Sequence, residues 1–160
     1  MKTNMTKYLA QAAVIAALYT VLTIALAPWS YGPIQVRVSE ALTVLPLFMS
    51  SSIPGLFIGC LLANIIGGFG AADIIFGSLP TLIAAILTYL WRGKNKYLAI
   101  LPPVVLNGLI VGAYVYILFD QTYPLPLTML FVALGQSVAV YGLGSVVMYI
   151  FKKYKLDALR

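Results

Sequence analysis

Histidine is absent from this sequence of 160 residues, and cysteine occurs once, at Cys60 inside an apolar run. Without histidine and without paired cysteines, the usual ligand spacings of zinc sites are missing. A single cysteine also excludes a disulfide within the chain. The sequence therefore gives no reason to expect a metal ion or a cofactor, and it argues against histidine-based acid–base catalysis.

Charge is scarce as well, since only 9% of the residues are charged and 62% are hydrophobic. Soluble domains have about 25% charged and about 45–50% apolar residues. The mean hydropathy of +0.99 places the chain in a lipid bilayer. Ten basic residues against four acidic ones give a net charge of +6. Because the basic residues form short clusters between apolar runs, they indicate membrane orientation and not nucleic-acid binding.

The apolar runs predict six transmembrane helices, over residues 6–27, 36–50, 53–67, 72–91, 99–119 and 127–151. About 20 residues are needed for each span, so this chain has room for six spans and no soluble domain. The expected fold is an all-α integral membrane protein, a compact six-helix bundle that forms one domain over residues 1–160.

An even number of spans places both termini on one side of the membrane. That side then holds nine of the ten basic residues, namely Lys2, Lys7, Arg92, Lys94, Lys96, Lys152, Lys153, Lys155 and Arg160. By the positive-inside rule this side is cytoplasmic. We therefore expect a multi-pass protein of the cell membrane with both termini in the cytoplasm.

Ionisable and amide side chains inside the predicted spans gather in the half remote from this basic side. They come from five helices and are Arg37, Glu40, Asn64, Asp73, Asn107 and Gln136. A charged side chain at a helix centre costs about 2.5–3.5 kcal/mol on insertion, so each one needs a partner or a ligand. Aromatic side chains lie close to the same depth, namely Tyr31, Phe69 and Tyr114. The combination predicts an outward-facing cavity for a polar, planar molecule.

Simpler interpretations of these residues remain open. Arg37 and Glu40 are three residues apart and can form an ion pair with each other. Asp73 can act as a helix cap, Asn107 and Gln136 can form interhelical hydrogen bonds, and the aromatic residues can belong to an interfacial belt.

Alanines in the first predicted helix form two pairs at a spacing of four, Ala12 with Ala16 and Ala13 with Ala17. Small residues at this spacing allow close helix–helix contact. Internal packing and a docking face for a partner protein both explain the pattern. A similar pair in the fifth predicted helix, Gly108 and Gly112, is interpreted as internal packing.

Several segments resemble a known family. They are IQVRVSEAL (34–42), PGLFIGC (54–60), AN (63–64), GG (67–68) and DIIFGSL (73–79). These segments are similar to the QueT family of proposed queuosine-precursor transporters, which are substrate-binding S components of energy-coupling-factor (ECF) ABC transporters. The resemblance is densest over residues 34–90 and weak beyond Pro102.

The resemblance implies high-affinity capture of queuine or a prequeuosine base, both 7-deazaguanines, from outside the cell. For such a ligand, the chemistry and depth of the residues suggest Glu40 as acceptor for the guanine-like edge and Asp73 as partner of the ammonium group, although the two carboxylates can exchange ends. Arg37 would orient Glu40 or donate to O6, and Asn64 would complete the edge. Tyr31, Phe69 and Tyr114 would stack on the ring.

The same resemblance implies partner proteins, because S components dock through an alanine-rich first helix on a transmembrane coupling protein with two cytoplasmic ATPases. Here that role falls to Ala12, Ala13, Ala16 and Ala17. The chain itself has no G-x-x-x-x-G-K-[ST] nucleotide-binding motif, so we expect a transport protein and not an enzyme. Two alternatives remain: an S component for another vitamin or nucleobase-like heterocycle, and a stand-alone ion-coupled secondary transporter.

Overall fold

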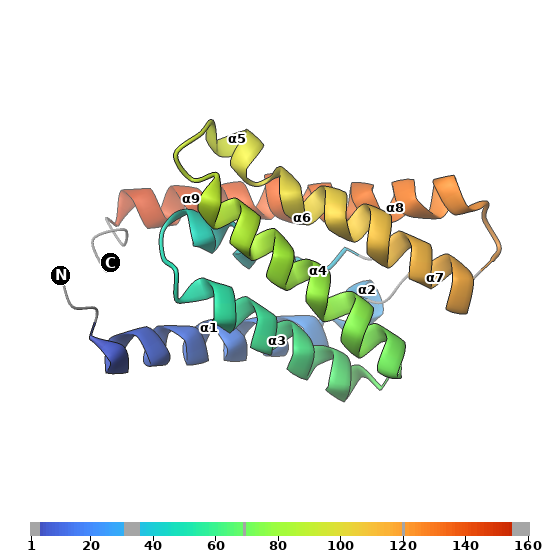
Figure 1. Cartoon of the computed structure of the whole chain (residues 1–160), viewed down its shortest axis with the longest axis horizontal. Helices are drawn as coiled ribbons and strands as arrows, with labels where there is room; N and C mark the ends of the chain where they lie inside the picture. The colour runs from blue at the N-terminus through green and yellow to red at the C-terminus, as the bar shows by residue number, and fades with distance from the viewer. Residues whose placement is uncertain (1–3, 31–35, 69, 120, 155–160) are drawn as a thin grey trace.

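The computed structural model describes residues 4–30, 36–68, 70–119 and 121–154. Within these ranges all regular structure is helical, which confirms the predicted all-α class. The described helices form six main segments arranged as one bundle. Figure 1 shows that α1 begins and α9 ends at the same end of this bundle.

Among the described residues, four helical runs are long and apolar enough to cross a membrane. They are α1 (Met5–Ala25), α4 (Ala71–Leu90), the run Lys96–Leu118 and the run Leu125–Lys153. The third run comprises α5 (Lys96–Ala99), α6 (Leu101–Leu106), η2 (Asn107–Val111) and α7 (Gly112–Leu118). The fourth comprises α8 (Leu125–Ser137), η3 (Val138–Leu143) and α9 (Gly144–Lys153).

The remaining helices are shorter. A four-residue helix, α2 (Ala27–Ser30), follows α1, and then come η1 (Val38–Leu47) with 10 residues and α3 (Ser52–Gly67) with 16. At about 2.0 Å per residue for η1 and about 1.5 Å for α3, they extend about 20 and 24 Å, less than the roughly 30 Å hydrocarbon core. The fold is that of a multi-pass membrane protein, and the count of six spans stays a prediction.

The helix η1 differs from the ordinary helix predicted over residues 36–50, because it is a 3₁₀ helix of ten residues. Runs of this kind longer than three or four residues are uncommon. Arg37 caps the helix start with an extended backbone and Glu40 follows in the first turn, so the two form a short row of polar residues at this end of η1. The Glu40 N–H donates to the Arg37 carbonyl at 3.0 Å. Since η1 packs against α1, α3, α4, η3 and α9, this row of polar residues lies inside the bundle.

Small residues allow α1 and α3 to lie side by side (Figure 1). Ala12 and Ala16 are buried in this contact opposite Gly55 and Gly59. A Cβ atom at Gly59 would lie 2.7 Å from the Tyr19 Cβ and 2.8 Å from the Ala16 carbonyl oxygen. The glycines are therefore required for the two backbones to approach, and this contact fixes the position of Tyr19.

Gly108 and Gly112 have the corresponding role between the η2–α7 segment and α8. A Cβ atom at Gly112 would lie 2.6 Å from the Met129 Cα, and one at Gly108 would lie 2.8 Å from the Ala133 Cβ. This confirms the prediction of internal packing for that pair. Both η2 and η3 are π-helical turns, which the sequence did not predict, and such turns are frequent at functional sites.

Candidate functional site

Asp73 lies in the first turn of α4 with only 4% of its surface exposed. Its Oδ1 atom accepts a hydrogen bond from the Tyr114 hydroxyl of α7 and lies 3.8 Å from Nη2 of Arg37. Its Oδ2 atom is buried and has no hydrogen-bond partner within the described ranges. Asp73 is thus more than a helix cap, because its side chain contacts residues of two other elements.

Asn64, near the end of α3, connects Arg37 to α4. Its Oδ1 atom accepts from Nη1 of Arg37 at 3.4 Å, and its Nδ2 atom donates to the Asp73 carbonyl at 3.1 Å and to Ser78 Oγ at 3.3 Å. A Cβ atom at Gly77 would lie 2.6 Å from Asn64 Nδ2, so glycine is needed there for the amide to reach α4. The amide is fully buried, and both of its ends are engaged.

Glu40 lies on η1 with 1% of its surface exposed. The Tyr19 hydroxyl of α1 donates to Oε1, and Nε2 of Gln136 on α8 donates to Oε2 at 2.7 Å. Tyr19 was not among the residues predicted from the sequence. The available signal was its position in the middle of a predicted membrane helix, because a buried tyrosine hydroxyl usually has a hydrogen-bond partner.

These contacts form one cluster, which we call the polar network. Its members are Tyr19, Arg37, Glu40, Asn64, Asp73, Tyr114 and Gln136. They come from α1, η1 with its capping residue, α3, α4, α7 and α8. Arg37 supplies one formal positive charge and the two carboxylates supply two negative ones, so the network carries a formal excess of one negative charge. A buried site of this kind favours a ligand that brings a positive charge.

A small cavity lies within the polar network. It is lined by Arg37, Glu40, Asn107, Val111, Val132 and Gln136. Its volume of about 10 Å³ matches a single water molecule, whereas ligand pockets measure about 300–1,000 Å³. A planar heterocycle can therefore enter only if the side chains around the cavity move apart.

The structure brings together most of the residues that the sequence proposed for a site. Arg37, Glu40, Asn107 and Gln136 line the cavity, and Asn64 and Asp73 contact Arg37. Tyr31 and Phe69 lie outside the described residues.

Tyr114 was expected to stack on a ligand, but its hydroxyl contacts Asp73. Its ring is 6.1 Å from that of Phe76 and 6.2 Å from that of Phe119, centroid to centroid. These contacts place Tyr114 as a hydrogen-bond donor to the carboxylate that also pairs with Arg37.

The four alanines of the proposed docking face divide into two pairs. Ala12 and Ala16 are buried against α3, so they face the interior of this chain. Ala13 and Ala17 are exposed on the outer side of α1. Their exposed neighbours there are Val14 and Leu18. A partner helix approaching α1 would meet Ala13 and Ala17 and not the other pair.

Comparison with known proteins identifies related sequences. The family described as "QueT transporter" matches residues 9–153 of the chain. A curated protein of Lactococcus lactis subsp. cremoris (strain MG1363), "Queuosine precursor transporter QueT", is 38% identical over 109 residues. The match covers 60% of this chain and 64% of the relative, so it spans just under two thirds of that protein's length. No solved structure matches the chain.

Proposed function

Because this chain belongs to the QueT transporter family, we propose that its polar network binds a queuosine precursor, a 7-deazaguanine base, for uptake across the membrane. The observation that carries the proposal is a buried network with one more carboxylate than cations, placed inside a membrane protein. Burying these charges costs free energy. Binding of a ligand explains why the protein retains them.

Glu40 is the residue we assign to the guanine-like edge of the base. That edge offers N–H donors at N1 and N2, and an ionised carboxylate accepts two hydrogen bonds side by side. In the structure the same two oxygens accept from Tyr19 and Gln136. Because Gln136 lines the cavity, we infer that its amide moves off Oε2 when the base enters. The ligand then replaces one hydrogen bond with another, which limits the free-energy cost of opening.

Asp73 is the residue we assign to the ammonium group of an amine-bearing precursor. Its Oδ2 atom is buried, and among the described residues it lacks a hydrogen-bond partner. An ammonium ligand would also cancel the excess negative charge of the network. Arg37 lines the cavity and pairs with Asp73, so its guanidinium can donate to O6 of the base, while Asn64 holds Arg37 through Oδ1.

Two ligands separate these assignments, the prequeuosine base with an aminomethyl group and the one with a nitrile in its place. We expect Asp73→Asn to weaken binding of the amine-bearing base about ten- to a hundredfold, because a hydrogen bond to a charged group contributes about 1.5–3 kcal/mol. The nitrile-bearing base has no ammonium group, so its affinity should change little. Glu40→Gln should weaken the binding of both ligands. Calorimetry or fluorescence with the detergent-solubilised protein measures each dissociation constant.

The matched control is Ser137→Ala. Ser137 is adjacent to Gln136, and its hydroxyl donates to the Ala133 carbonyl within the same helix at 2.7 Å. This variant should bind both ligands like the wild type. Unchanged affinity in Glu40→Gln and Asp73→Asn would reject the site, and the reverse pattern of ligand dependence would exchange the two assignments. An unfolding curve for each variant distinguishes a lost contact from a lost fold.

We further infer that the chain acts as an S component that captures substrate while partner subunits hydrolyse ATP. The absence of a G-x-x-x-x-G-K-[ST] motif from the sequence supports this division of labour. The partners would be an ECF transmembrane coupling protein and two cytoplasmic ATPases, with the basic end of the bundle in the cytoplasm. On this proposal Ala13 and Ala17 form the contact on α1, because they are small and exposed.

Ala13→Trp and Ala17→Trp test the docking proposal. Both should leave ligand binding intact and abolish co-purification with the coupling subunits, because an indole prevents close helix contact. Leu109→Trp, at an exposed position of η2, is the matched control and should preserve both activities. Uptake by cells without any ECF subunits would instead support a stand-alone transporter.

A further inference from the structure

A second, larger cavity lies between α5 and α9, at the end of the bundle remote from the polar network. Its volume is about 500 Å³. We call it the basic pocket, and it is lined by Lys96, Tyr97, Ser145, Met148, Tyr149, Lys152 and Lys153. The Tyr141 hydroxyl donates to the Tyr97 carbonyl at 2.9 Å, which ties α5 to η3 and holds one wall in place.

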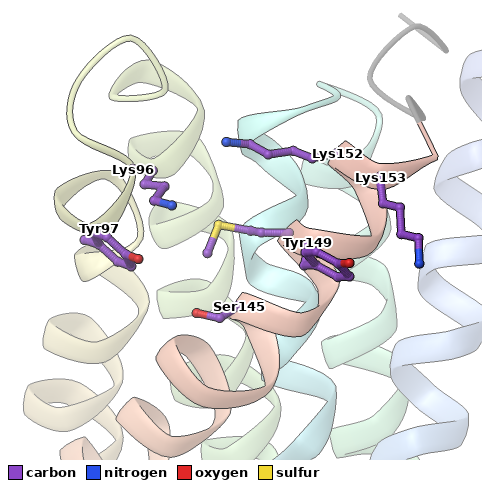
Figure 2. A pocket seen from close by; sticks show the side chains of 7 residues that line it. Lys96, Tyr97, Ser145, Tyr149, Lys152 and Lys153 are labelled. Carbon is purple, nitrogen blue, oxygen red and sulfur yellow. The ribbon is translucent and has the colours of Figure 1, made fainter.

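The basic pocket carries positive charge that no described carboxylate balances. Its lining includes three lysines and no acidic residue. The acidic residues within the described ranges are Glu40 and Asp73, and both are buried in the polar network. Figure 2 shows the Lys96 and Lys152 side chains extending from opposite walls of the pocket, whereas the Lys153 side chain extends in a different direction from α9. Lys96, whose ammonium lies 4.7 Å from the centre of the Tyr97 ring, and Lys152 thus both line this cavity without a carboxylate among its other lining residues.

The surface around the basic pocket is apolar and faces outward. Leu98, Val146 and Ile150 are 41–55% exposed, and Tyr97 and Tyr149 are 51% and 63% exposed. Tyrosines with lysines at the ends of membrane helices are typical of the membrane–water interface. A ligand suited to this surface has an anionic head and apolar chains. A free phosphate ion would make no use of the apolar part.

We propose that the basic pocket binds the headgroup of an anionic phospholipid. Lys96 and Lys152 hold the phosphate, the rings of Tyr97 and Tyr149 lie at headgroup level, and the acyl chains run along the exposed apolar residues beside the pocket. Basic pockets between membrane helices bind anionic headgroups in this way. The lipid would keep α5 and α9 together at this end of the bundle, independently of which substrate the polar network takes.

The experiment uses native mass spectrometry to measure the lipid that the full-length protein retains. The protein is first purified from a mixture of phosphatidylglycerol and phosphatidylcholine. The wild type should retain phosphatidylglycerol in preference to phosphatidylcholine. In the double variant Lys96→Gln/Lys152→Gln the preference should fall about 25-fold, at roughly fivefold for each lysine near an anionic surface. The matched control is Lys7→Gln/Arg92→Gln, which removes the same charge from residues that do not line the pocket. This control variant should retain most of the preference for phosphatidylglycerol over phosphatidylcholine.

Three results would overturn the proposal. Equal losses in the two double variants would show that only overall charge matters. If excess inorganic phosphate lowered phosphatidylglycerol retention as much as the double substitution does, the pocket would be assigned to a free anion. Unchanged lipid retention together with loss of co-purified coupling subunits would make the pocket a protein interface. Queuosine-precursor affinity should be the same in all variants, so failure here is distinguishable from failure of the proposed function.

Discussion

The polar network and the basic pocket hold charges in opposite ways. In the network, Arg37, Glu40 and Asp73 are at most 5% exposed and reach partners on other helices. In the pocket, Lys96 and Lys152 are exposed and the lining contains no carboxylate. A buried charge depends on every partner that stabilises it, whereas an exposed charge is stabilised by water. Substitutions should therefore have large, coupled effects in the network and small, independent effects in the pocket.

The largest difference between the two regions is expected when one charge is removed from each. Arg37→Met leaves Asp73 buried without its ion-pair partner, which should lower the free energy of unfolding by about 3–5 kcal/mol. Lys152→Met should change it by less than about 0.5 kcal/mol, because the side chain is exposed. Denaturant titration in mild detergent measures both. The double variant Arg37→Met/Asp73→Asn should recover part of the loss, and similar losses in the two single variants would contradict the comparison.

A smaller effect should follow from removing one hydroxyl from each region. Tyr19→Phe takes the donor from Oε1 of Glu40 with little change in shape, and we expect a loss of about 1.5–3 kcal/mol, as for a hydrogen bond to a charged group. Tyr149→Phe in the basic pocket is the matched control, and it should be nearly neutral because its side chain is exposed. The same unfolding titration applies. A stable Tyr19→Phe protein would mean that Glu40 is satisfied without Tyr19.

The gathering of the polar network could be predicted from the sequence because charged side chains in a membrane interior are too costly to face lipid. That argument needs only depth, so it located Arg37, Glu40, Asn64, Asp73 and Gln136 without helix geometry. It could not assign partners. Arg37 and Glu40 are neighbours in sequence, yet the cross-helix ion pair of Arg37 is with Asp73, from a different helix.

Other features depend on packing between helices, which the sequence does not reveal. The 3₁₀ geometry of η1, which packs against five other elements, is one of them, because the apolar run over residues 36–50 predicts only an ordinary helix. The alanines of α1 show the same limit. The spacing marked two pairs equally, and the position of Gly55 and Gly59 on α3 decides that Ala12 and Ala16 face inward.

The smallest expected effect needs no substitution, because the two regions are compared at two salt concentrations. Raising salt from about 0.1 M to about 1 M shortens the Debye length from about 10 Å to about 3 Å, and this screens exposed charges far more than buried ones. Phosphatidylglycerol retention by the basic pocket should fall several-fold over this range, while the dissociation constant for the amine-bearing precursor should change by less than about twofold. Mass spectrometry and calorimetry on one preparation measure the two quantities. An equally steep fall in precursor affinity would mean that the polar network binds its ligand in contact with bulk water, and the contrast between the two regions would be lost.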